Sequence, residues 1–304
     1  MLKLVIIILN YKTPKLVQEC LSSIATQIEG LSARVVVVDN ASPDNSQEEI
    51  ANTIKQNNWE AWCELKCSPR NAGFAAGNNL GIKSIKAEAY LLLNSDTVVK
   101  NDAISILIEK MDSSSELGII SCHLEGPHGE WQTKKFRFIS PLSELILTAN
   151  IGLLSKFFKC WQVPILENDN TPAEWVCFAA VLIRKSVFDK IGLLDEGYFM
   201  YYEDVDFCRR AQLNSIDIGV CEEAKIVHLI GASSNANLSI PSRQKRRPAY
   251  YYKARNKYFK RYYRNTFTAN LFWLAGRIVS IIISPLRRSS QTSYEKDYLD
   301  IWTH

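Results

Sequence analysis

One stretch decides the fold of this chain: Ala89-Tyr-Leu-Leu-Leu-Asn-Ser-Asp-Thr-Val-Val99. Its apolar run from Tyr90 to Leu93 holds no turn residue, which predicts a strand buried on both faces of an α/β sheet. The run ends at Asn94-Ser95-Asp96, the kind of strand end beside which open α/β sheets bind ligands. Asp96 could hold Mg²⁺ or Mn²⁺ against a diphosphate there, because hard cations prefer carboxylate and phosphate oxygens. Alternatively, Asp96 caps the helix predicted from about Asn101, or closes a turn.

The segments before this stretch alternate between strand and helix patterns. Leu2 to Leu9 and Arg34 to Val38 are apolar, β-branched runs typical of buried strands. Thr13-Pro14 predicts a helix start, with Thr as the N-cap and Pro in the first helical position. A second helix is predicted from Ser46 and a third strand over Trp62 to Cys67. This order predicts an α/β fold with a mostly parallel sheet and right-handed crossovers.

A glycine-rich segment precedes the deciding stretch. The loop from Pro69 to Asn79 leads into a helix predicted to end near Lys86. Gly73, Gly77 and Gly81 are four residues apart and would share one helical face, where the backbone can approach another element closely. The spacing does not match GxGxxG, so no dinucleotide-binding fold is predicted.

The second half of the chain predicts further elements and one irregular region, residues 123–172. The predicted helices and strands are a helix from about Asn101 to Met111, a strand over Leu117 to Cys122, a helix around Pro141 to Phe158, a strand over Ala173 to Arg184, a helix over Phe188 to Leu194, and strands over Ile216 to Val220 and Lys225 to Leu229.

Charge divides the chain into a body, residues 1–235, and a C-terminal extension, residues 236–304. The formal net charge is +4, but residues 224–294 hold 14 Lys and Arg and no acidic residue. The rest of the chain carries 22 basic against 32 acidic residues. A basic tail on an acidic body indicates a tail that meets an anionic partner.

The extension combines basic, aromatic and apolar segments. Arg243 to Arg264 contains ten basic residues interleaved with seven aromatic ones, and Phe267 to Ile283 is nearly apolar. The apolar run is shorter than the roughly 20 residues of a spanning helix. We expect a helix that lies in a membrane interface, drawn there by anionic headgroups. A tail packed on the body is the alternative; no motif that reads a nucleic-acid groove accompanies the basic run, so we expect no nucleic-acid partner.

The cysteines and the N-terminus indicate a reducing compartment. Eight scattered cysteines form no CxxC pair, which argues against a structural zinc site. The first apolar run ends in Asn10-Tyr11 without a small-residue cleavage site, so no signal peptide is predicted. We therefore expect a cytoplasmic protein with free thiols.

A second polar concentration lies in Tyr202-Glu203-Asp204-Val205-Asp206, behind an aromatic cluster. Adjacent carboxylates repel each other and apolar rings desolvate them, and both effects raise a pKa toward the range of a general base. Glu203 and Asp204 are therefore candidate catalytic residues. The structural alternative is an acidic helix N-terminus with Asp206 paired to Arg210.

Single residues at other predicted strand ends give weaker indications. His228 could complete a metal site with Asp96, or be a satisfied core histidine. Asp39 could be a turn former and Arg70 a solvated loop charge. Together these residues indicate one crevice along the carboxyl edge of the sheet.

Five motifs, in correct order, resemble the family-2 glycosyltransferases of GT-A fold, in particular the rhamnosyltransferase-like branch of bacterial cell-surface polysaccharide synthesis. The resemblance covers roughly residues 1–235. The motifs are Ile7-Ile8-Leu9-Asn10-Tyr11, Val37-Val38-Asp39-Asn40-Ala41-Ser42, Asn71-Ala72-Gly73-Phe74-Ala75, Leu92-Leu93-Asn94-Ser95-Asp96 and Tyr202-Glu203-Asp204-Val205-Asp206.

The resemblance implies roles for these residues. Asp39 would contact the donor base, and Asp96 would hold the divalent cation, Mg²⁺ or Mn²⁺, with the help of His228. Asp204 would deprotonate the acceptor hydroxyl, and Trp175 matches an aromatic residue near the acceptor. The other substrate-binding candidates are Asn10, Tyr11, Arg70, Asn71, Gly73 and Asn94.

The function implied is transfer of a sugar, with inversion, from a nucleotide-diphospho-sugar (dTDP-rhamnose or a UDP-sugar) to a saccharide or lipid-linked acceptor. We expect it at the cytoplasmic face of the inner membrane. The alternatives are a non-catalytic nucleotide-sugar binder and a nucleotidyltransferase; the latter would need a basic phosphate-clamping segment, for which the N-terminal half offers only Arg70. The chain departs from the family pattern at Ser95, where Pro is common, and at Cys177-Phe178, where the family usually has Ser-Gly.

Overall fold

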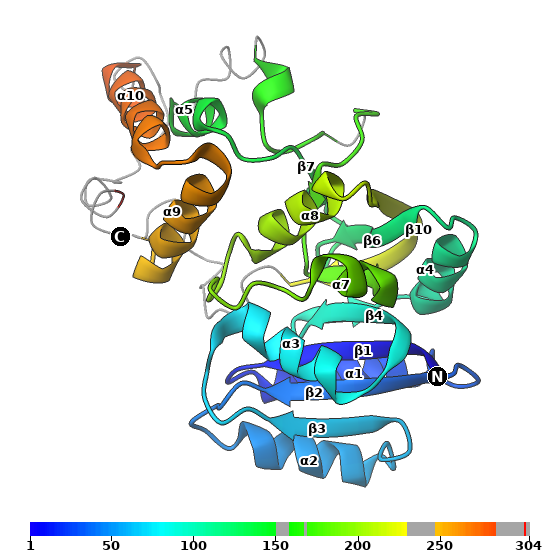
Figure 1. Cartoon of the computed structure of the whole chain (residues 1–304). Helices are drawn as coiled ribbons and strands as arrows, with labels where there is room; N and C mark the ends of the chain where they lie inside the picture. The colour runs from blue at the N-terminus through cyan, green and yellow to red at the C-terminus, as the bar shows by residue number, and fades with distance from the viewer. Residues whose placement is uncertain (150–157, 167–168, 230–246, 284–300, 302–304) are drawn as a thin grey trace.

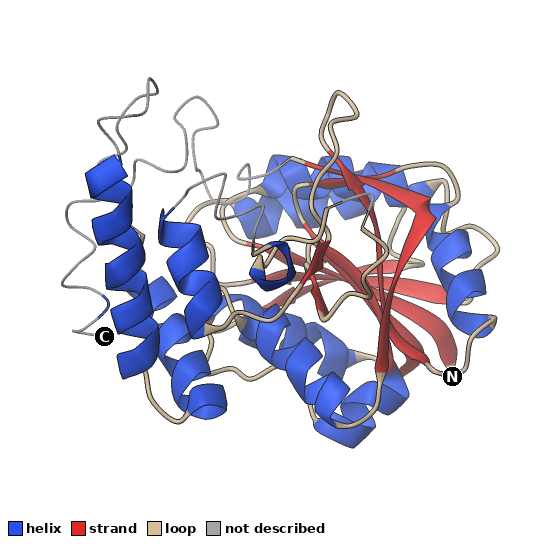
Figure 2. Cartoon of the chain, turned by 90° about the horizontal axis from the view of Figure 1, so that it is seen from above, coloured by secondary structure: helices blue, strands red, loops and turns tan. Residues whose placement is uncertain are grey.

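The computed structural model describes residues 1–149, 158–166, 169–229, 247–283 and 301. An eight-stranded sheet, with strand order β3-β2-β1-β4-β9-β6-β10-β5, runs between two layers of helices (Figures 1 and 2). A two-stranded sheet of β7 (Lys135–Phe136) and β8 (Trp175–Val176) lies beside it. The mixed, mostly parallel α/β sheet predicted from the sequence is confirmed.

The N-terminal half supplies four parallel neighbours, β3 (Cys63–Cys67), β2 (Ala33–Asp39), β1 (Leu2–Asn10) and β4 (Ala87–Asn94). Their register pairs Asn10 with Asp39 and Leu9 with Asn94. Because parallel strands end at the same edge, these polar residues meet there.

The other strands complete the sheet with mixed directions. β9 (Ala180–Arg184) runs antiparallel between β4 and β6 (Leu117–Glu125). β10 (Asp217–His228) is parallel to β6 and antiparallel to β5 (Thr97–Val99). This last pairing places Thr97 opposite His228, so the chain just after the deciding stretch meets the end of β10.

Helices cover both faces of the sheet. α1 (Pro14–Ala25), α2 (Ser46–Gln56) and α4 (Ala103–Asp112) pack into one core cluster, and α3 (Gly73–Ser84), α7 (Lys185–Ile191) and α8 (Glu203–Leu213) into the other. α5 (Pro141–Ala149), α9 (Ala249–Tyr263) and α10 (Phe267–Ile283) gather at one end of the molecule (Figures 1 and 2), and a 3₁₀ turn spans Lys159–Trp161.

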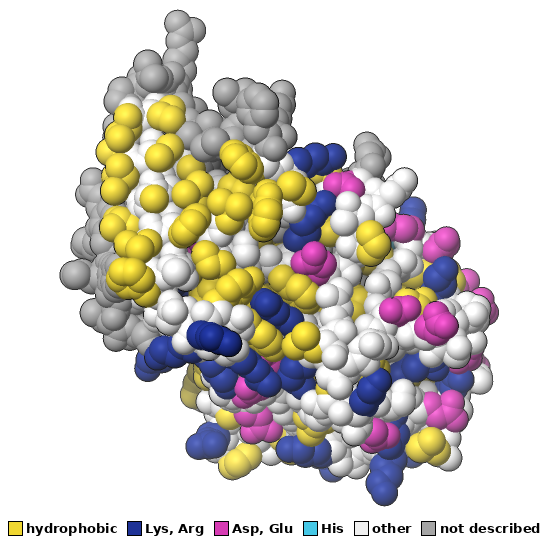
Figure 3. Space-filling view, turned by 45° about the horizontal axis from the view of Figure 1, so that its top comes forward, with side chains coloured by type: hydrophobic (Ala, Val, Ile, Leu, Met, Phe, Trp, Pro, Cys, Tyr) yellow, Lys and Arg dark blue, Asp and Glu magenta, His cyan; other side chains and the backbone are white. Residues whose placement is uncertain are grey.

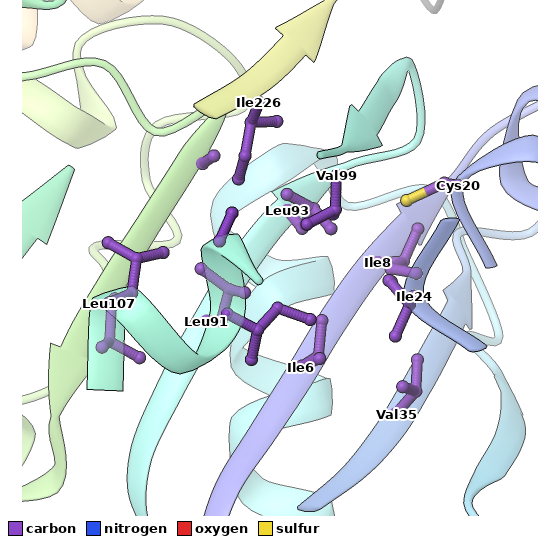
Figure 4. Close-up of a cluster of buried hydrophobic side chains, with 14 of the residues drawn as sticks. Ile6, Ile8, Cys20, Ile24, Val35, Leu91, Leu93, Val99, Leu107 and Ile226 are labelled. Atoms are coloured by element: carbon purple, nitrogen blue, oxygen red, sulfur yellow. The ribbon is translucent and has the colours of Figure 1, made fainter. Parts of the chain in front are cut away.

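The strand β1 is buried on both faces, as predicted. Ile6 and Ile8 join the cluster of Figure 4, with Leu91 of β4, while Val5 and Ile7 join the cluster on the opposite face. Alternate residues of a strand point to opposite faces, so a continuous apolar run is what a doubly covered strand requires.

The glycine face of α3 packs on β1. A side chain at Gly77 would clash with Leu9, and one at Gly81 would meet Ile7, so the close approach predicted from the spacing is confirmed. The helix begins earlier than the predicted loop allowed, at Gly73, whose φ of +91° suits glycine. Asn79 lies inside the helix because its buried side chain donates to the carbonyl oxygen of Leu194, at 2.9 Å.

The predicted start of α1 is confirmed, with Thr13 at the N-cap position and Pro14 as the first helical residue, although the hydroxyl of Thr13 contacts Asn10 and Ser95 and makes no capping hydrogen bond. Several other predicted boundaries were wrong. The strand predicted over Ala173 to Arg184 is interrupted between β8 and β9, and the two strands predicted from Ile216 to Leu229 are one bulged strand, β10. The alternative of Asp96 as a helix cap also fails, since Asp102 precedes α4.

The C-terminal helices are joined to the body by buried contacts. α9 contributes Ala254, Tyr258 and Phe259 to the second core cluster. The predicted boundary after residue 235 and part of the helix predicted to Phe158 lie outside the described residues, and the division into two domains stays a prediction. Among the described helices, none combines the length and the apolar character needed to cross a bilayer.

The glycine contact gives a test of the packing. Gly81→Val should lower the free energy of unfolding by about 1–3 kcal/mol, because the new Cβ would lie 2.6 Å from Ile7 Cγ2. Urea unfolding followed by circular dichroism measures the change. Lys83→Val is the matched control, since Lys83 is exposed on the same helix and pairs only with the exposed Glu196. Equal stability of the two variants would contradict the packing described.

Candidate active site

A buried hydrogen-bond chain runs beneath the carboxyl edge of the sheet. Asn10 Nδ2 donates to Asp39 Oδ1 at 2.7 Å, and Thr13 Oγ1 donates to Asn10 Oδ1 at 3.1 Å. Thr13 Oγ1 also lies 3.1 Å from Ser95 Oγ. The chain therefore connects the ends of β2, β1 and β4, and the hydroxyl of Ser95 takes part in it where the family often has Pro.

Asp39 forms the turn that follows β2. Its Oδ2 accepts hydrogen bonds from the backbone N–H of Ser42, at 3.0 Å, and from Gln47 Nε2, at 2.8 Å. Its Oδ1 accepts from Ser42 Oγ as well as from Asn10. The turn-forming interpretation is confirmed, while contact with a donor base stays a prediction.

The glycine-rich segment, residues 69–79, is hydrogen-bonded both to the turn after β2 and to the segment that leads into α8. Asn40 Nδ2 donates to Asn71 Oδ1, at 2.9 Å, and to the carbonyl oxygen of Gly73, at 3.2 Å. The N–H of Phe74 donates to the carbonyl oxygen of Phe199, at 2.6 Å, and a Cβ at Gly73 would clash with that carbonyl. The segment that starts α3 therefore holds the segment that leads into α8.

Two of the predicted residues lie apart from this hydrogen-bond chain. Tyr11 is 41% exposed and Arg70 is exposed. Asn94 belongs to the edge through its backbone: its N–H donates to the carbonyl oxygen of Ala179, at 2.8 Å, and its carbonyl oxygen accepts from Thr97. No contact in the described residues gives Tyr11 or Arg70 a fixed position in the crevice.

Asp96 and His228 meet, as the sequence predicted. His228 Nε2 lies 3.5 Å from Asp96 Oδ1 in a region where both side chains are largely buried. Gln132 orients the imidazole of His228. The Nε2 of Gln132 donates to the carbonyl oxygen of His228 at 2.7 Å, so the Oε1 of Gln132, which lies 3.2 Å from His228 Nδ1, is the acceptor for that nitrogen. Nδ1 therefore carries a proton, and Nε2 faces the carboxylate of Asp96.

This arrangement fits a divalent cation. An imidazole nitrogen and a carboxylate that face each other can both ligate one cation, and Mn²⁺ accepts both oxygen and imidazole ligands. Within the described ranges, no three His, Cys, Asp or Glu side chains gather closely enough to ligate one ion. A cation held by this pair would keep open positions for phosphate oxygens and water. Gln132 was not predicted, because it lies in the segment without a sequence pattern.

Glu203 and Asp204 begin α8 after two residues with left-handed backbone, Tyr201 and Tyr202, whose φ angles are 71° and 69°. Glu203 is buried, and its Oε2 has no hydrogen-bond partner among the described residues. Burial, and then the charge of Asp204, raise the pKa of Glu203 well above its usual value.

The side chain of Asp204 is less buried than that of Glu203 and accepts hydrogen bonds from backbone N–H groups. Its Oδ1 accepts from the N–H of Val205 at 2.8 Å. Burial raises the pKa of Asp204, and hydrogen bonds from backbone N–H groups, Val205 first, oppose that rise. The perturbed pKa values predicted for this pair are thus present, and they suit a group that accepts a proton near neutral pH.

Asp206 has the structural role that the sequence indicated. Arg210 Nε donates to its Oδ2 at 2.9 Å, at the predicted i,i+4 spacing. Tyr262 Oη donates to its Oδ1 at 2.9 Å, and Arg261 Nη1 lies 3.0 Å from the same oxygen. Asp206 therefore attaches α9 to α8.

The segment from Cys177 to Ala179 joins the two acidic groups, because the backbone of Phe178 hydrogen-bonds to Asp204 and the carbonyl oxygen of Ala179 accepts from the N–H of Asn94, at 2.8 Å. Burial, and then the charge of Asp204, raise the pKa of the Cys177 thiol to about 12, with smaller contributions from Glu203 and Asp96. All three carboxylates are thus within electrostatic reach of one side chain. Trp175, in strand β8 just before Cys177, is buried, stacks on Phe136 with ring centroids 4.2 Å apart and donates its N–H to the carbonyl oxygen of Arg137.

Comparisons with known proteins agree with this architecture. The sequence model described as glycosyl transferase family 2 matches residues 5–192. The low-salt glycan biosynthesis hexosyltransferase Agl10 of Haloferax volcanii is 31% identical over 232 residues, 73% of this chain and 66% of that protein. The dTDP-rhamnosyl transferase RfbF of Shigella flexneri is 26% identical over 246 residues, 78% of this chain and 74% of that protein.

Solved structures show the same fold. The mannosyltransferase PcManGT from Pyrobaculum calidifontis, in complex with GDP-Man and Mn²⁺, superposes with a TM-score of 0.59 at 11% identity, covering 95% of this chain and 76% of that chain. GalNAc-T7 with UDP, GalNAc and Mn²⁺ superposes with a TM-score of 0.58 at 11% identity, covering 75% of this chain and 44% of that chain. The fold is therefore of the GT-A type, and the chain belongs to glycosyl transferase family 2 as a glycosyltransferase.

Proposed function

We propose that the chain transfers a sugar from a nucleoside-diphosphate sugar to a hydroxyl group of a saccharide or lipid-linked acceptor, with inversion at the anomeric carbon. The observation that carries this proposal is that the Glu203–Asp204 pair, with its raised pKa values, is joined through the segment 178–179 to the end of β4, next to Asp96, which lies 3.5 Å from His228. dTDP-rhamnose is the first donor to test, because a relative over three quarters of this chain is described as a dTDP-rhamnosyl transferase. A UDP-sugar is the alternative donor.

Asp204 acts as the general base in this proposal. It accepts the proton of the acceptor hydroxyl while that oxygen forms a bond to the anomeric carbon and the bond to the nucleoside diphosphate breaks. One displacement inverts the anomeric configuration and requires no covalent intermediate. Glu203 lies beside Asp204, and burial, followed by the charge of Asp204, raises the pKa of Glu203 well above its usual value.

Asp96 and His228 would hold the divalent cation, Mn²⁺ or Mg²⁺. When bound, such a cation neutralises the negative charge that develops on the departing diphosphate. Asn10 and Ser95 position this pair indirectly, through the buried hydrogen-bond chain. Asn71 and Gly73 belong to the glycine-rich segment, and Asp39 lies in the neighbouring turn. We assign binding of the donor nucleotide to these residues.

The proposed setting is the cytoplasmic face of the inner membrane, in cell-surface polysaccharide synthesis. All eight cysteines lie in described positions and are free thiols, which agrees with a reducing compartment. Relatives described as glycan and rhamnosyl enzymes favour the polysaccharide assignment.

A non-catalytic nucleotide-sugar binder is the rival from another class. Such a protein would gain nothing from a buried pair of carboxylates with raised pKa values, since burial of charge costs stability. A nucleotidyltransferase would need basic side chains clamping the phosphates, and Arg70 is an exposed loop residue. Measuring whether radiolabelled sugar leaves the donor separates the binder from the enzyme.

Replacing the base should remove catalysis and spare binding. Asp204→Asn should lower the transfer rate by about 10² or more while the donor still raises the melting temperature. The exposed Asp189→Asn is the control, because it removes a carboxylate that pairs only with Lys185. Transfer near the wild-type rate in folded Asp204→Asn would disprove the assignment.

Removing the metal ligand should act on donor binding. In the presence of Mn²⁺, the correct donor should raise the melting temperature of the wild type, and a screen of dTDP-rhamnose and UDP-sugars identifies it. Asp96→Ala should lose this rise, and EDTA should abolish it in the wild type. Asp112→Ala, at an exposed surface position, should behave as the wild type. Full wild-type activity after exhaustive chelation would contradict the metal assignment.

The carboxylate pair should make activity and stability respond oppositely to pH. Both folded-state pKa values are raised, so between the unfolded and folded pKa the folded chain binds more protons than the unfolded chain. In that interval the contribution of the pair to the free energy of unfolding falls as pH rises, while transfer increases as Asp204 loses its proton. Initial rates and urea unfolding over about pH 4–8 measure both.

The difference between the wild type and Glu203→Gln isolates the stability effect from other groups. Because the amide cannot ionise, Glu203→Gln should gain stability relative to the wild type as the pH rises. Glu48→Gln, at an exposed position of α2, should show no such trend. A difference that stays constant with pH would mean that Glu203 does not titrate with a raised pKa.

A further inference from the structure

The helix α10 buries the polar side chains of Asn270 and Arg277 beside Ala269 and Trp273, and it exposes several of its large apolar side chains. Its buried residues include Asn270, Gly276 and Arg277, and Arg277 is the only charged residue in the helix. Its exposed apolar side chains, together with Leu147 of α5, form a surface that we call the α10 face. These side chains are Leu147, Phe267, Leu271, Phe272, Ile278, Ile281 and Ile282, with exposed fractions between 36% and 68%.

This orientation is imposed by specific contacts. Asn270 Oδ1 accepts from Arg255 Nη1 at 2.7 Å, and Arg255 Nη2 donates to Glu144 Oε2 at 3.0 Å, all three side chains being buried. A Cβ at Gly276 would clash with Thr148, so α10 lies tightly against α5. Rotating α10 to bury its apolar side would break this polar cluster, which is costly because each buried partner would be left unsatisfied.

The surroundings of the α10 face are basic. The exposed residues Lys253, Lys260 and Arg264 belong to α9 and its end, directly before α10 in the sequence, while the exposed Arg261 pairs with Asp195 and Asp206. Residues 224–294 contain no acidic residue. Figure 3 shows hydrophobic side chains gathered at the upper left, with Lys and Arg side chains along the lower border of this surface.

We propose that the α10 face inserts into the interfacial region of an anionic phospholipid bilayer, with α10 lying in the plane of the membrane. The helix is about 25 Å long, so it offers four turns of apolar side chains to the acyl boundary. The basic side chains of α9 meet anionic headgroups, which complements their charge. A second copy of the chain would instead bring like charges together across a symmetric contact.

The face is connected to the crevice through α9. Tyr251 of α9 contacts Tyr202, the residue before Glu203, with ring centroids 5.7 Å apart. Arg209 of α8 lies 4.3 Å from the ring of Tyr262. The proposal rests on the proposed function in one respect, because it brings the end of the site that holds Glu203 and Asp204 close to the membrane. Its test needs no sugar transfer and is therefore independent of that function.

Flotation of the full chain with vesicles tests the proposal. The chain should float with vesicles of phosphatidylcholine containing about 30% phosphatidylglycerol, and most of it should remain bound in ~1 M NaCl, because salt screens charges but not inserted apolar side chains. Leu271→Glu/Ile278→Glu should lower the partition coefficient by about tenfold or more. Both residues are exposed on one side of α10, one heptad apart.

Leu213→Glu is the matched control. Leu213 is 72% exposed at the end of α8, so the change replaces one apolar side chain outside the α10 face and adds one negative charge, as Ile282→Glu does within that face. Leu213→Glu should bind vesicles as the wild type does. Ile282→Glu, in the last turn of α10, provides a second variant should the double one fail to fold. Lys253→Glu/Lys260→Glu should weaken binding to the anionic vesicles at low salt but not to vesicles of phosphatidylcholine alone.

Three outcomes would overturn the proposal. The full chain could stay unbound with anionic vesicles at low salt. The folded α10 variants could bind as tightly as Leu213→Glu. Sedimentation could show a wild-type dimer that Leu271→Glu/Ile278→Glu dissociates, without vesicle binding, in which case the α10 face is an interface between copies of the chain.

Discussion

The hydrogen-bond chain from Asp39 through Asn10 and Thr13 to Ser95 underlies the whole carboxyl edge of the sheet. These side chains are buried, so each needs its partner, and the loss of one would leave another polar group unsatisfied. This chain of hydrogen bonds connects the ends of β1, β2 and β4 to one another. As a consequence, the turn after β2 and the acidic end of β4 face the same side of the molecule.

The acidic crevice combines stabilising and destabilising arrangements. The negative charge of Asp206 is paired with Arg210 and Arg261, and Tyr262 donates a hydrogen bond to its carboxylate. Glu203, three residues earlier, is buried with an oxygen that has no partner among the described residues. The same helix therefore carries one carboxylate that secures α9 and one whose burial costs stability. Such a cost is expected where a perturbed pKa serves chemistry.

The C-terminal helices connect the crevice to the molecular surface. Asp206 and Arg209 hold α9 against α8, and the buried Arg255 joins α9 to α5 and α10. The polar cluster around Arg255 also determines which side of α10 faces outward. One buried charge thereby specifies an orientation that hydrophobic burial alone would reverse.

Local patterns in the sequence determined much of the fold and part of the site. The apolar runs of β1 and β4, the glycine face of α3 and the Asp206–Arg210 pair all depend on residues a few positions apart, which a short window encodes. The adjacent carboxylates Glu203 and Asp204 could be predicted for the same reason. The strand-end positions of Asp96 and His228 indicated that the two could share a metal site, and the family resemblance implied the same pairing.

Only the tertiary structure decided contacts between distant segments. Gln132, which orients His228, belongs to a segment without periodicity. Thr13 lies at the predicted N-cap position, but its hydroxyl contacts Ser95 of a distant segment, which the sequence did not indicate. The apolar character of Phe267–Ile283 was evident from the sequence, but its outward orientation depends on Asn270 meeting Arg255. Periodicity shows which residues share a face, whereas the partner that a face meets is set by the packing of the whole chain.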